Sequence, residues 1–288
     1  MSVLLIEPSP HIKSTLTTQK IMLNVLIALL PSVIAGTVIF GLRALLLVVL
    51  CAAFCVVFEY LFNLITKREQ TVYDLSAAVT GVLLGMNLPP SMPVYMAAIG
   101  CFAAIIVVKQ FFGGIGQNFA NPAITARIIL MLSFGKYMTT WTKPFSSGLS
   151  AADAVSSATP LADPEIMPSY LDMFLGNRAG CIGETCTVAL LIGGLYLIIR
   201  GLIDPVTPVA FIGTVAVCSL ISGQDVLMQV MSGGLILGAF FMATDYATTP
   251  MTRAGRLVFG LGCGLITCGI RFFGVYPEGV SYSILIMN

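Results

Sequence analysis

The segment that decides the fold class is "RALLLVVLCAAFCVVFEYLFNLIT", residues 43–66. After its first residue it holds one charged side chain, Glu59, and a helix of about 20 apolar residues is long enough to cross a bilayer. Nine further segments have this character, at about residues 21–41, 73–88, 93–112, 121–135, 183–201, 205–222, 225–243, 254–273 and 279–288. The sequence therefore predicts an all-α polytopic membrane protein with about ten transmembrane helices. The last segment is too short to cross alone, so we expect it to be truncated or to enter the membrane only halfway.

Composition supports this class and excludes others. Of the 288 residues 57% are hydrophobic and 9% charged, whereas about a quarter of a soluble domain is charged. The net charge of +1 gives no reason to expect nucleic acid as a partner. The first 20 residues lack a basic stretch followed directly by an apolar one, so we expect no cleaved signal and predict that the first helix stays in the mature protein.

Cysteine and histidine limit the chemistry of the chain. Six of the eight cysteines lie inside apolar segments and are expected to act as small packing residues. Cys181 and Cys186 lie near a membrane boundary and leave a disulfide or metal pair open. The only histidine, His11, lies in the N-terminal tail, which excludes a histidine metal site or base inside the membrane. We assign no catalytic residue and no metal ligand, and without a GxGxxG motif we expect no NAD site.

The sequence contains a weak internal repeat. "TGVLLGMN", residues 80–87, resembles "GGLILGAF", residues 233–240, and a shift of 153 residues superimposes the first five predicted helices on the last five. Because five is an odd number, the two halves would lie in the membrane with opposite orientations, as in many carriers built from inverted repeats. The predicted units are an N-terminal tail (1–20), a first repeat (21–135), a polar segment (136–182) and a second repeat (183–288).

Two helices are predicted to start on a cap followed by proline. Asn121 and Pro122 open the fifth helix, and Thr249 and Pro250 open the ninth. A helix that starts at membrane depth presents free N–H groups to a ligand. Arg127 follows within about two turns, so this end suits a phosphate or the electron-rich edge of a reduced flavin. The alternative is an ordinary helix start, with Arg127 reaching to the interface.

Intramembrane charge is costly and is a functional hypothesis by default. Glu59 is the deepest carboxylate of the predicted helices and our first candidate for an ion path, with Asp74 as the second. Lysine and arginine are more frequent on the side of the N-terminus, which predicts a cytoplasmic N-terminus and an outer position for residues 136–182.

Three stretches carry a resemblance to a known family. "DAVSSATPL", residues 153–161, resembles an attachment motif for covalent FMN, Asp-x-x-Ser/Thr-Gly/Ser-Ala-Thr. "VVKQFFGGIGQNFANPA", residues 107–123, and "GVLLGMNLPP", residues 81–90, complete the set. Together they resemble the D subunits of the Rnf complexes, which are ion-pumping ferredoxin:NAD oxidoreductases of bacterial inner membranes. The B subunits of sodium-pumping NADH:quinone oxidoreductases are related. Ser157 stands where the motif often has glycine.

The resemblance implies a redox role. Thr159 would carry FMN through a phosphoester, with Asp153, Ser156, Ser157 and Ala158 forming the surrounding loop. It further implies a non-covalent riboflavin between the repeats, nearer the cytoplasm, for which Asn121 and Arg127 are candidate contacts.

The implied partners are the rest of an Rnf complex and the lipid bilayer. They comprise the flavin-bearing G subunit, the membrane-embedded A and E subunits, and the NAD-side C subunit. The ion would be Na⁺ or H⁺. The alternatives are a channel or secondary transporter built from the same inverted repeats, and a scaffold protein without a cofactor.

Overall fold

A computed structural model describes residues 17–145, 156–157, 169–274 and 278–288. The first half contains α1 (Thr18–Phe40), α2 (Leu42–Ile65), the 3₁₀ turn η1 (Val72–Asp74), α3 (Ser76–Met86), α4 (Val94–Phe102) with its π-helical continuation η2 (Ala103–Gln110), and α5 (Pro122–Ser133). The second half contains α8 (Thr187–Ile199), α9 (Val206–Ile221), α10 (Val226–Met231), α11 (Leu235–Leu237) with the π-helical η4 (Gly238–Met242), α12 (Arg253–Phe273) and α13 (Val280–Met287). Between them lie α6 (Gly135–Met138), β1 (Trp141–Thr142), β2 (Ser156–Ser157) and α7 (Tyr170–Leu175).

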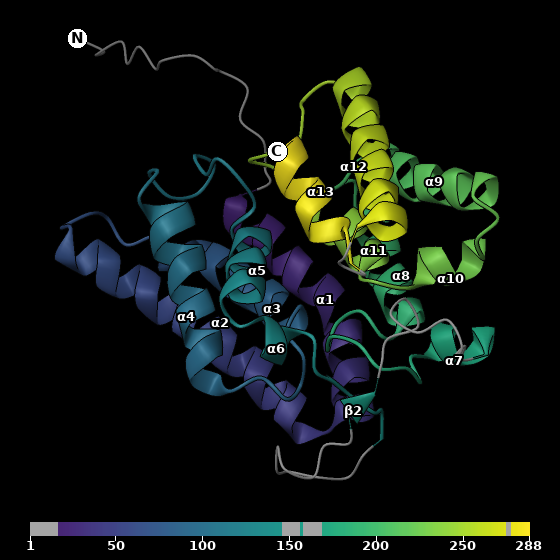
Figure 1. Ribbon diagram of the computed structural model, residues 1–288. Coiled ribbons are helices and arrows are strands. Elements are labelled where there is room, and N and C mark those ends of the chain that lie inside the picture. Colours follow the sequence, from purple (N-terminus) through teal and green to yellow (C-terminus); the bar gives the residue numbers. More distant parts are fainter. Residues whose placement is uncertain (1–16, 146–155, 158–168, 275–277) are drawn as a thin grey trace.

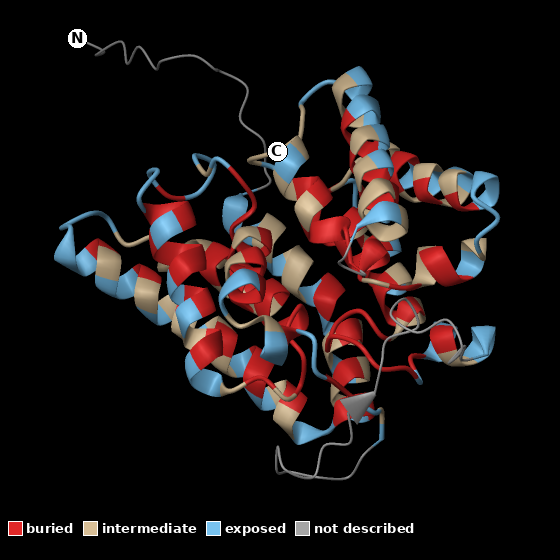
Figure 2. Ribbon diagram, in the orientation of Figure 1, coloured by how far each residue is buried: buried red, intermediate tan, exposed pale blue. Residues whose placement is uncertain are grey.

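The predicted all-α class is confirmed. Figure 1 shows the first half, in purple and teal, beside the second half, in green and yellow. Helices α1, α2 and α12 are long and apolar enough to cross a membrane, and five further apolar helices are shorter. In α1 and α2 only 28% of the most apolar window is buried inside the protein, which leaves wide apolar faces for lipid. Figure 2 shows exposed residues on these outward faces and buried residues where the helices meet.

The predicted helix at 225–243 is not continuous. Gly233 and Gly234 have φ angles of +65° and +66°, a left-handed conformation that separates α10 from α11. The guanidinium of Arg271 donates to the main-chain oxygen of Ser232, at 2.9 Å, and so satisfies a carbonyl that the break releases. The break went unpredicted because both glycines lie within an apolar run.

The ninth helix spans the predicted residues but has a different N-cap from the predicted one. Its N-cap is Thr252, whose hydroxyl accepts the N–H of Gly255 at 3.1 Å. Thr249, the predicted cap, instead donates its hydroxyl to the main-chain oxygen of Ala243 at 2.8 Å. The fifth helix does begin as predicted, because the side chain of Asn121 accepts the N–H groups of Ala123 and Ile124 and Pro122 is the first helical residue.

Close helix pairs hold each half together. A Cβ atom at Gly81 of α3 would lie 2.6 Å from the Cα atom of Ala52 in α2, so only glycine fits there. In the second half the close pair is α9 with α12, where a Cβ at Gly260 would lie 2.9 Å from the main-chain oxygen of Thr207. Small residues therefore allow the backbones to approach in both halves, as in membrane helix pairs generally.

The two halves meet at a seam formed by α1 with α8 and by α5 with α13. A Cβ atom at Gly193 of α8 would lie 2.1 Å from the main-chain oxygen of Ala28 in α1. Asn121 of the first half donates its amide to the main-chain oxygen of Met242 in the second half at 3.2 Å. The seam is thus closely packed and also contains polar contacts.

The close contact at Gly81 generates a stability prediction. Gly81→Ala should destabilise the protein by about 1–3 kcal/mol, because α2 and α3 must move apart. The control is Gly213→Ala in α9, where a Cβ meets nothing within 4 Å, and this change should be neutral or stabilising by up to about 1 kcal/mol. Thermal unfolding in detergent measures both, and equal midpoints for the two variants would contradict the packing account.

Candidate functional site

A pocket of about 510 Å³ lies between the two halves. Its walls come from the first turns of α1, from α3, η2 and the start of α5, and from α8, η4 and the segment that follows η4. Leu83, Phe240 and Phe241 are among its apolar residues, and its polar residues include Ser76, Thr80, Lys109, Asn118, Asn121, Thr244 and Asp245. An apolar pocket with a few convergent polar groups is the usual form of a small-molecule site.

The N-terminus of α5 forms one wall of this pocket. Asn121, Pro122 and Ala123 all line it, so the first turn of a capped helix faces the space, which is one of the two alternatives that the sequence left open. Asn118 lines the same wall, and its buried Oδ1 atom accepts no hydrogen bond from the described residues. A ligand N–H placed there would satisfy this acceptor, because a buried polar atom without a partner is unfavourable.

A buried ion pair joins the pocket to α2. The Nζ atom of Lys109 lies 2.7 Å from Oε2 of Glu59 and 2.8 Å from the hydroxyl of Ser76. The other Glu59 oxygen accepts the hydroxyl of Thr71 at 2.5 Å. Glu59 is fully buried and Lys109 is 2% exposed, so the predicted deep carboxylate is confirmed as buried and is neutralised by a lysine on the pocket wall.

Asp74 occupies a different environment from Glu59. It ends the turn η1 just before α3, is half-buried, and takes part in none of the ion pairs formed by the described residues. The structure therefore brings Glu59, but not Asp74, into a charged cluster beside the pocket.

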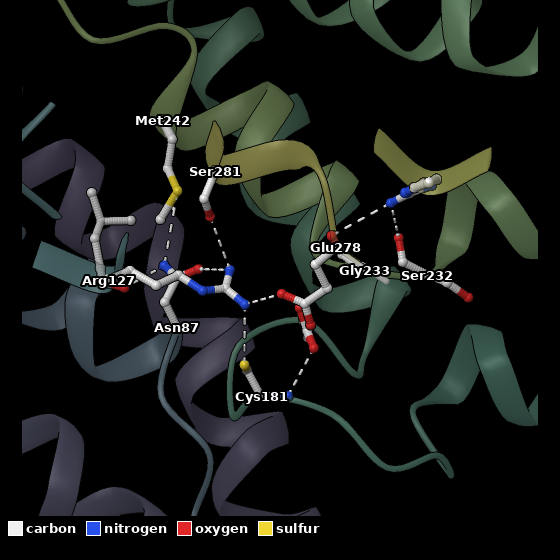
Figure 3. Close-up of polar contacts among 11 residues, drawn as sticks. Asn87, Arg127, Cys181, Ser232, Gly233, Met242, Glu278 and Ser281 are labelled. Carbon is white, nitrogen blue, oxygen red and sulfur yellow. Dashed lines mark hydrogen bonds and ion pairs between the residues drawn. The ribbon is translucent and has the colours of Figure 1, made fainter. Parts of the chain in front are cut away.

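Arg127 lies in a second buried cluster (Figure 3). Its guanidinium forms an ion pair with Glu278, donates to Oδ1 of Asn87 at 2.9 Å and approaches the sulfur of Cys181 at 3.6 Å. Arg127 is 3% exposed, so it does not reach to an interface, and it lies about 9 Å along α5 from Asn121 at 1.5 Å per residue. Asn121 faces the pocket, whereas Arg127 bridges the two halves.

Sequence reasoning missed most members of this second cluster. Glu184 accepts the N–H of Cys181 at 2.8 Å, and Arg178 donates to the main-chain oxygen of Glu184 at 2.6 Å. Cys181 and Cys186 are both free thiols, so the disulfide that the sequence left open does not form in this structure. One residue could have indicated this cluster from the sequence: Glu278 is a carboxylate directly before the last predicted apolar segment.

The proposed flavin-bearing loop falls largely outside the described residues. Asp153, Ala158 and Thr159 are not described, and of Ser156 and Ser157 only the backbone is. That backbone forms β2, which pairs antiparallel with β1 so that Ser157 faces Trp141. Trp141 is buried and packs with Ala179 and Cys181.

The pocket and this hairpin lie near opposite ends of α1. Ile21, in the first turn of α1, lines the pocket, whereas the N–H of Phe145 donates to the main-chain oxygen of Ile39 at 2.8 Å. The intervening 18 residues correspond to about 27 Å of helix. The two candidate regions are therefore separated by nearly the thickness of a hydrocarbon core.

Comparison with known proteins identifies the family. The model of the NQR2, RnfD, RnfE family matches residues 5–288. The D subunit of the "Na(+)-translocating ferredoxin:NAD(+) oxidoreductase complex" of Acetobacterium woodii is 47% identical, over 99% of this chain and 90% of that protein. The D subunit of the "Proton-translocating ferredoxin:NAD(+) oxidoreductase complex" of Clostridium ljungdahlii is 43% identical, over 100% of this chain and 92% of that protein. The D subunit of an "Ion-translocating oxidoreductase complex" of Rhodobacter capsulatus is 36% identical, over 89% and 82%. The chain belongs to the NQR2, RnfD, RnfE family.

Proposed function

We propose that this chain is the membrane electron-transfer component of an Rnf complex, which couples ferredoxin:NAD electron transfer to the translocation of Na⁺ or H⁺. Its relatives carry the names of such complexes over nearly the whole chain. The observation that carries the redox role is the placement of two candidate cofactor regions near opposite ends of α1, about 27 Å apart at 1.5 Å per residue. A protein that moves electrons across a membrane needs redox groups near both faces.

The first redox group is FMN, esterified to the hydroxyl of Thr159. Antiparallel pairing with β1 anchors the backbone of Ser156 and Ser157, two residues before this threonine. The loop residues between Asp153 and Thr159 are small, which leaves space for a bulky flavin and access for the enzyme that attaches it. A covalent link keeps the flavin at a fixed place relative to its redox partners.

The second redox group is a non-covalent flavin in the pocket between the halves. The volume of about 510 Å³ falls within the range of small-molecule sites, and Leu83, Phe240 and Phe241 supply apolar walls. Asn118 offers an unpaired acceptor for the imide N–H of a flavin, and the first turn of α5 offers positive potential to its carbonyl edge. When bound, the flavin would supply one- and two-electron redox chemistry.

The pairing of helices at the seam supports the inverted-repeat fold. Helix α1 packs on α8 and α5 on α13, and these are the pairs that the 153-residue shift equates. In the membrane we place the N-terminus and the pocket at the cytoplasmic face and the hairpin at the outer face. The partners are the G, A, E and C subunits of a bacterial inner-membrane complex.

The ion path runs past Glu59. The carboxylate is fully buried and its partner Lys109 lines the pocket, so a charge change in the pocket acts directly on this ion pair. In a low-dielectric interior such an effect is strong. Asp74, near the start of α3, is the second candidate on the path.

The covalent flavin is tested on a denaturing gel under ultraviolet light. Natively produced complex should give a fluorescent band for this chain, with an intact mass above 30.5 kDa by one FMN less one water. Thr159→Val should abolish the fluorescence, whereas the control Thr140→Val, an exposed threonine of the same polar segment, should retain it. A dark wild-type band would favour a channel, a transporter or a cofactor-free scaffold.

The pocket flavin is tested by acid extraction from purified complex. Asn118→Leu should lower the affinity for non-covalent flavin by about tenfold or more, because it removes a buried hydrogen-bond acceptor and adds an apolar side chain. The control is Asn177→Leu, at an exposed position near α7 that does not line the pocket. Full flavin occupancy in the Asn118 variant at low flavin concentration would place the flavin elsewhere.

The ion path is tested in sealed vesicles. Glu59→Gln alone leaves Lys109 as a buried unpaired cation, which costs about 3–5 kcal/mol of stability. The informative variant is therefore the double change Glu59→Gln with Lys109→Met, which removes both charges. It should fold and lose most ion uptake per NAD reduced, while Glu69→Gln, an exposed control, should not. Undiminished uptake in the double variant would exclude Glu59 from the path.

A further inference from the structure

Two carboxylates meet in the Arg127 cluster without a donor between them. Glu184 comes from the loop before α8 and Glu278 from the residues before α13, and each is 5% exposed. One oxygen of each carboxylate and the sulfur of Cys181 lie within 4.8 Å of one another. Figure 3 shows the guanidinium of Arg127 in contact with both the carboxylate of Glu278 and the sulfur of Cys181.

Each carboxylate has one satisfied and one unsatisfied oxygen. Oε1 of Glu184 accepts the N–H of Cys181 at 2.8 Å, and Oε2 of Glu278 accepts from Arg127. Oε2 of Glu184 and Oε1 of Glu278 are buried and have no partner among the described residues. Two ionised carboxylates this close in a low-dielectric interior repel each other, and both orphan oxygens lack a donor. A proton on either carboxylate would remove the repulsion between the two negative charges.

We propose that Glu184 and Glu278 form an acid pair that binds one exchangeable proton at the seam between the two halves. This site is separate from the pocket and does not depend on the flavin proposed there. The geometry favours a proton over a hard cation, because only three ligand atoms converge and one of them is a thiol. Hard cations bound by proteins take about six oxygen ligands.

The charged groups around the pair explain why the proton can leave. Arg127 from α5, Arg178 from the loop before α8 and Arg271 from α12 all face the cluster, together with the thiol of Cys181 and the phenol of Tyr282 on α13. Three arginines against two carboxylates leave the fully ionised cluster with a charge of +1. This positive excess weakens proton binding. The unpaired oxygens favour the bound proton, whereas the arginines favour its release.

Two of the three arginines make no bond to either carboxylate. Arg178 donates to the main-chain oxygens of Glu184 and Thr185 and to the hydroxyl of Ser232. Arg271 donates to the main-chain oxygens of Gln229 and Ser232. Only Arg127 pairs directly with a carboxylate, and it does so across the seam. Proton occupancy therefore sets the charge that Arg127 meets and with it the strength of the contact between the two halves.

Glu184→Gln is the decisive variant, because glutamine places a permanent N–H where the shared proton would lie and keeps the Arg127–Glu278 pair. A proton held more tightly in the folded than in the unfolded protein stabilises at low pH, and this contribution is lost as pH rises. The melting temperature of the wild-type complex should therefore fall through the titration of the pair. The melting temperature of the Glu184→Gln complex should change less with pH and should exceed the wild-type value at alkaline pH.

Infrared difference spectroscopy across the same pH range supplies the second readout. Wild-type complex should show the carbonyl band of a protonated carboxylic acid that disappears as pH rises. The band should be lost in Glu184→Gln and in Glu278→Gln and retained in the exposed control Glu69→Gln. Should Glu278→Gln fail to fold, Glu184→Gln decides the question.

Two results would overturn the proposal. One is the absence of such a band in wild-type complex, or its persistence in Glu184→Gln. The other is stabilisation by NaCl but not by choline chloride that Glu184→Gln abolishes, which would show a Na⁺ site in place of the proton.

Discussion

The structure depends on satisfying polar groups in an interior that water does not reach. Between the two halves a helix is interrupted, another starts, and their free N–H and carbonyl groups need partners within the protein. Asn121 supplies several at once: its side chain caps α5 and its amide reaches the main-chain oxygen of Met242 in the other half. At the break before α11, the guanidinium of Arg271 donates to the main-chain oxygen of Ser232.

These polar contacts leave two regions of different character along α3 and α5. The pocket lies where the helix ends face an apolar space, and the Arg127 cluster lies where buried charged side chains of the two halves meet. The first has a volume of about 510 Å³, which suits a small-molecule ligand. The pocket and the charged cluster are therefore neighbours on the same helices but are formed by different side chains.

The fold was largely predictable because apolar runs and caps are local signals. The limits of α1, α2 and α12 agree with the predicted segments to within about three residues, and the Asn121-Pro122 start was read correctly. The break at Gly233 and Gly234 was not predicted, because small residues in an apolar run also occur in continuous helices. The clusters were the hardest part to predict: Arg127 and Glu278 are 151 residues apart, and a single sequence carries no signal for such a contact.

The π-helical segments η2 and η4 bear on how this family tolerates change in length. A π-helix holds one more residue per hydrogen-bonded ring than an α-helix, and it occurs frequently at functional sites. In η2 that widened stretch ends at Lys109 and Gln110 and orients the lysine toward Glu59. A π-helix turns by less per residue than the roughly 100° of an α-helix, so a segment one residue shorter could close into an α-helix and still present this lysine in nearly the same orientation. The π-helix thus accommodates one additional residue at this point without turning the lysine away from Glu59.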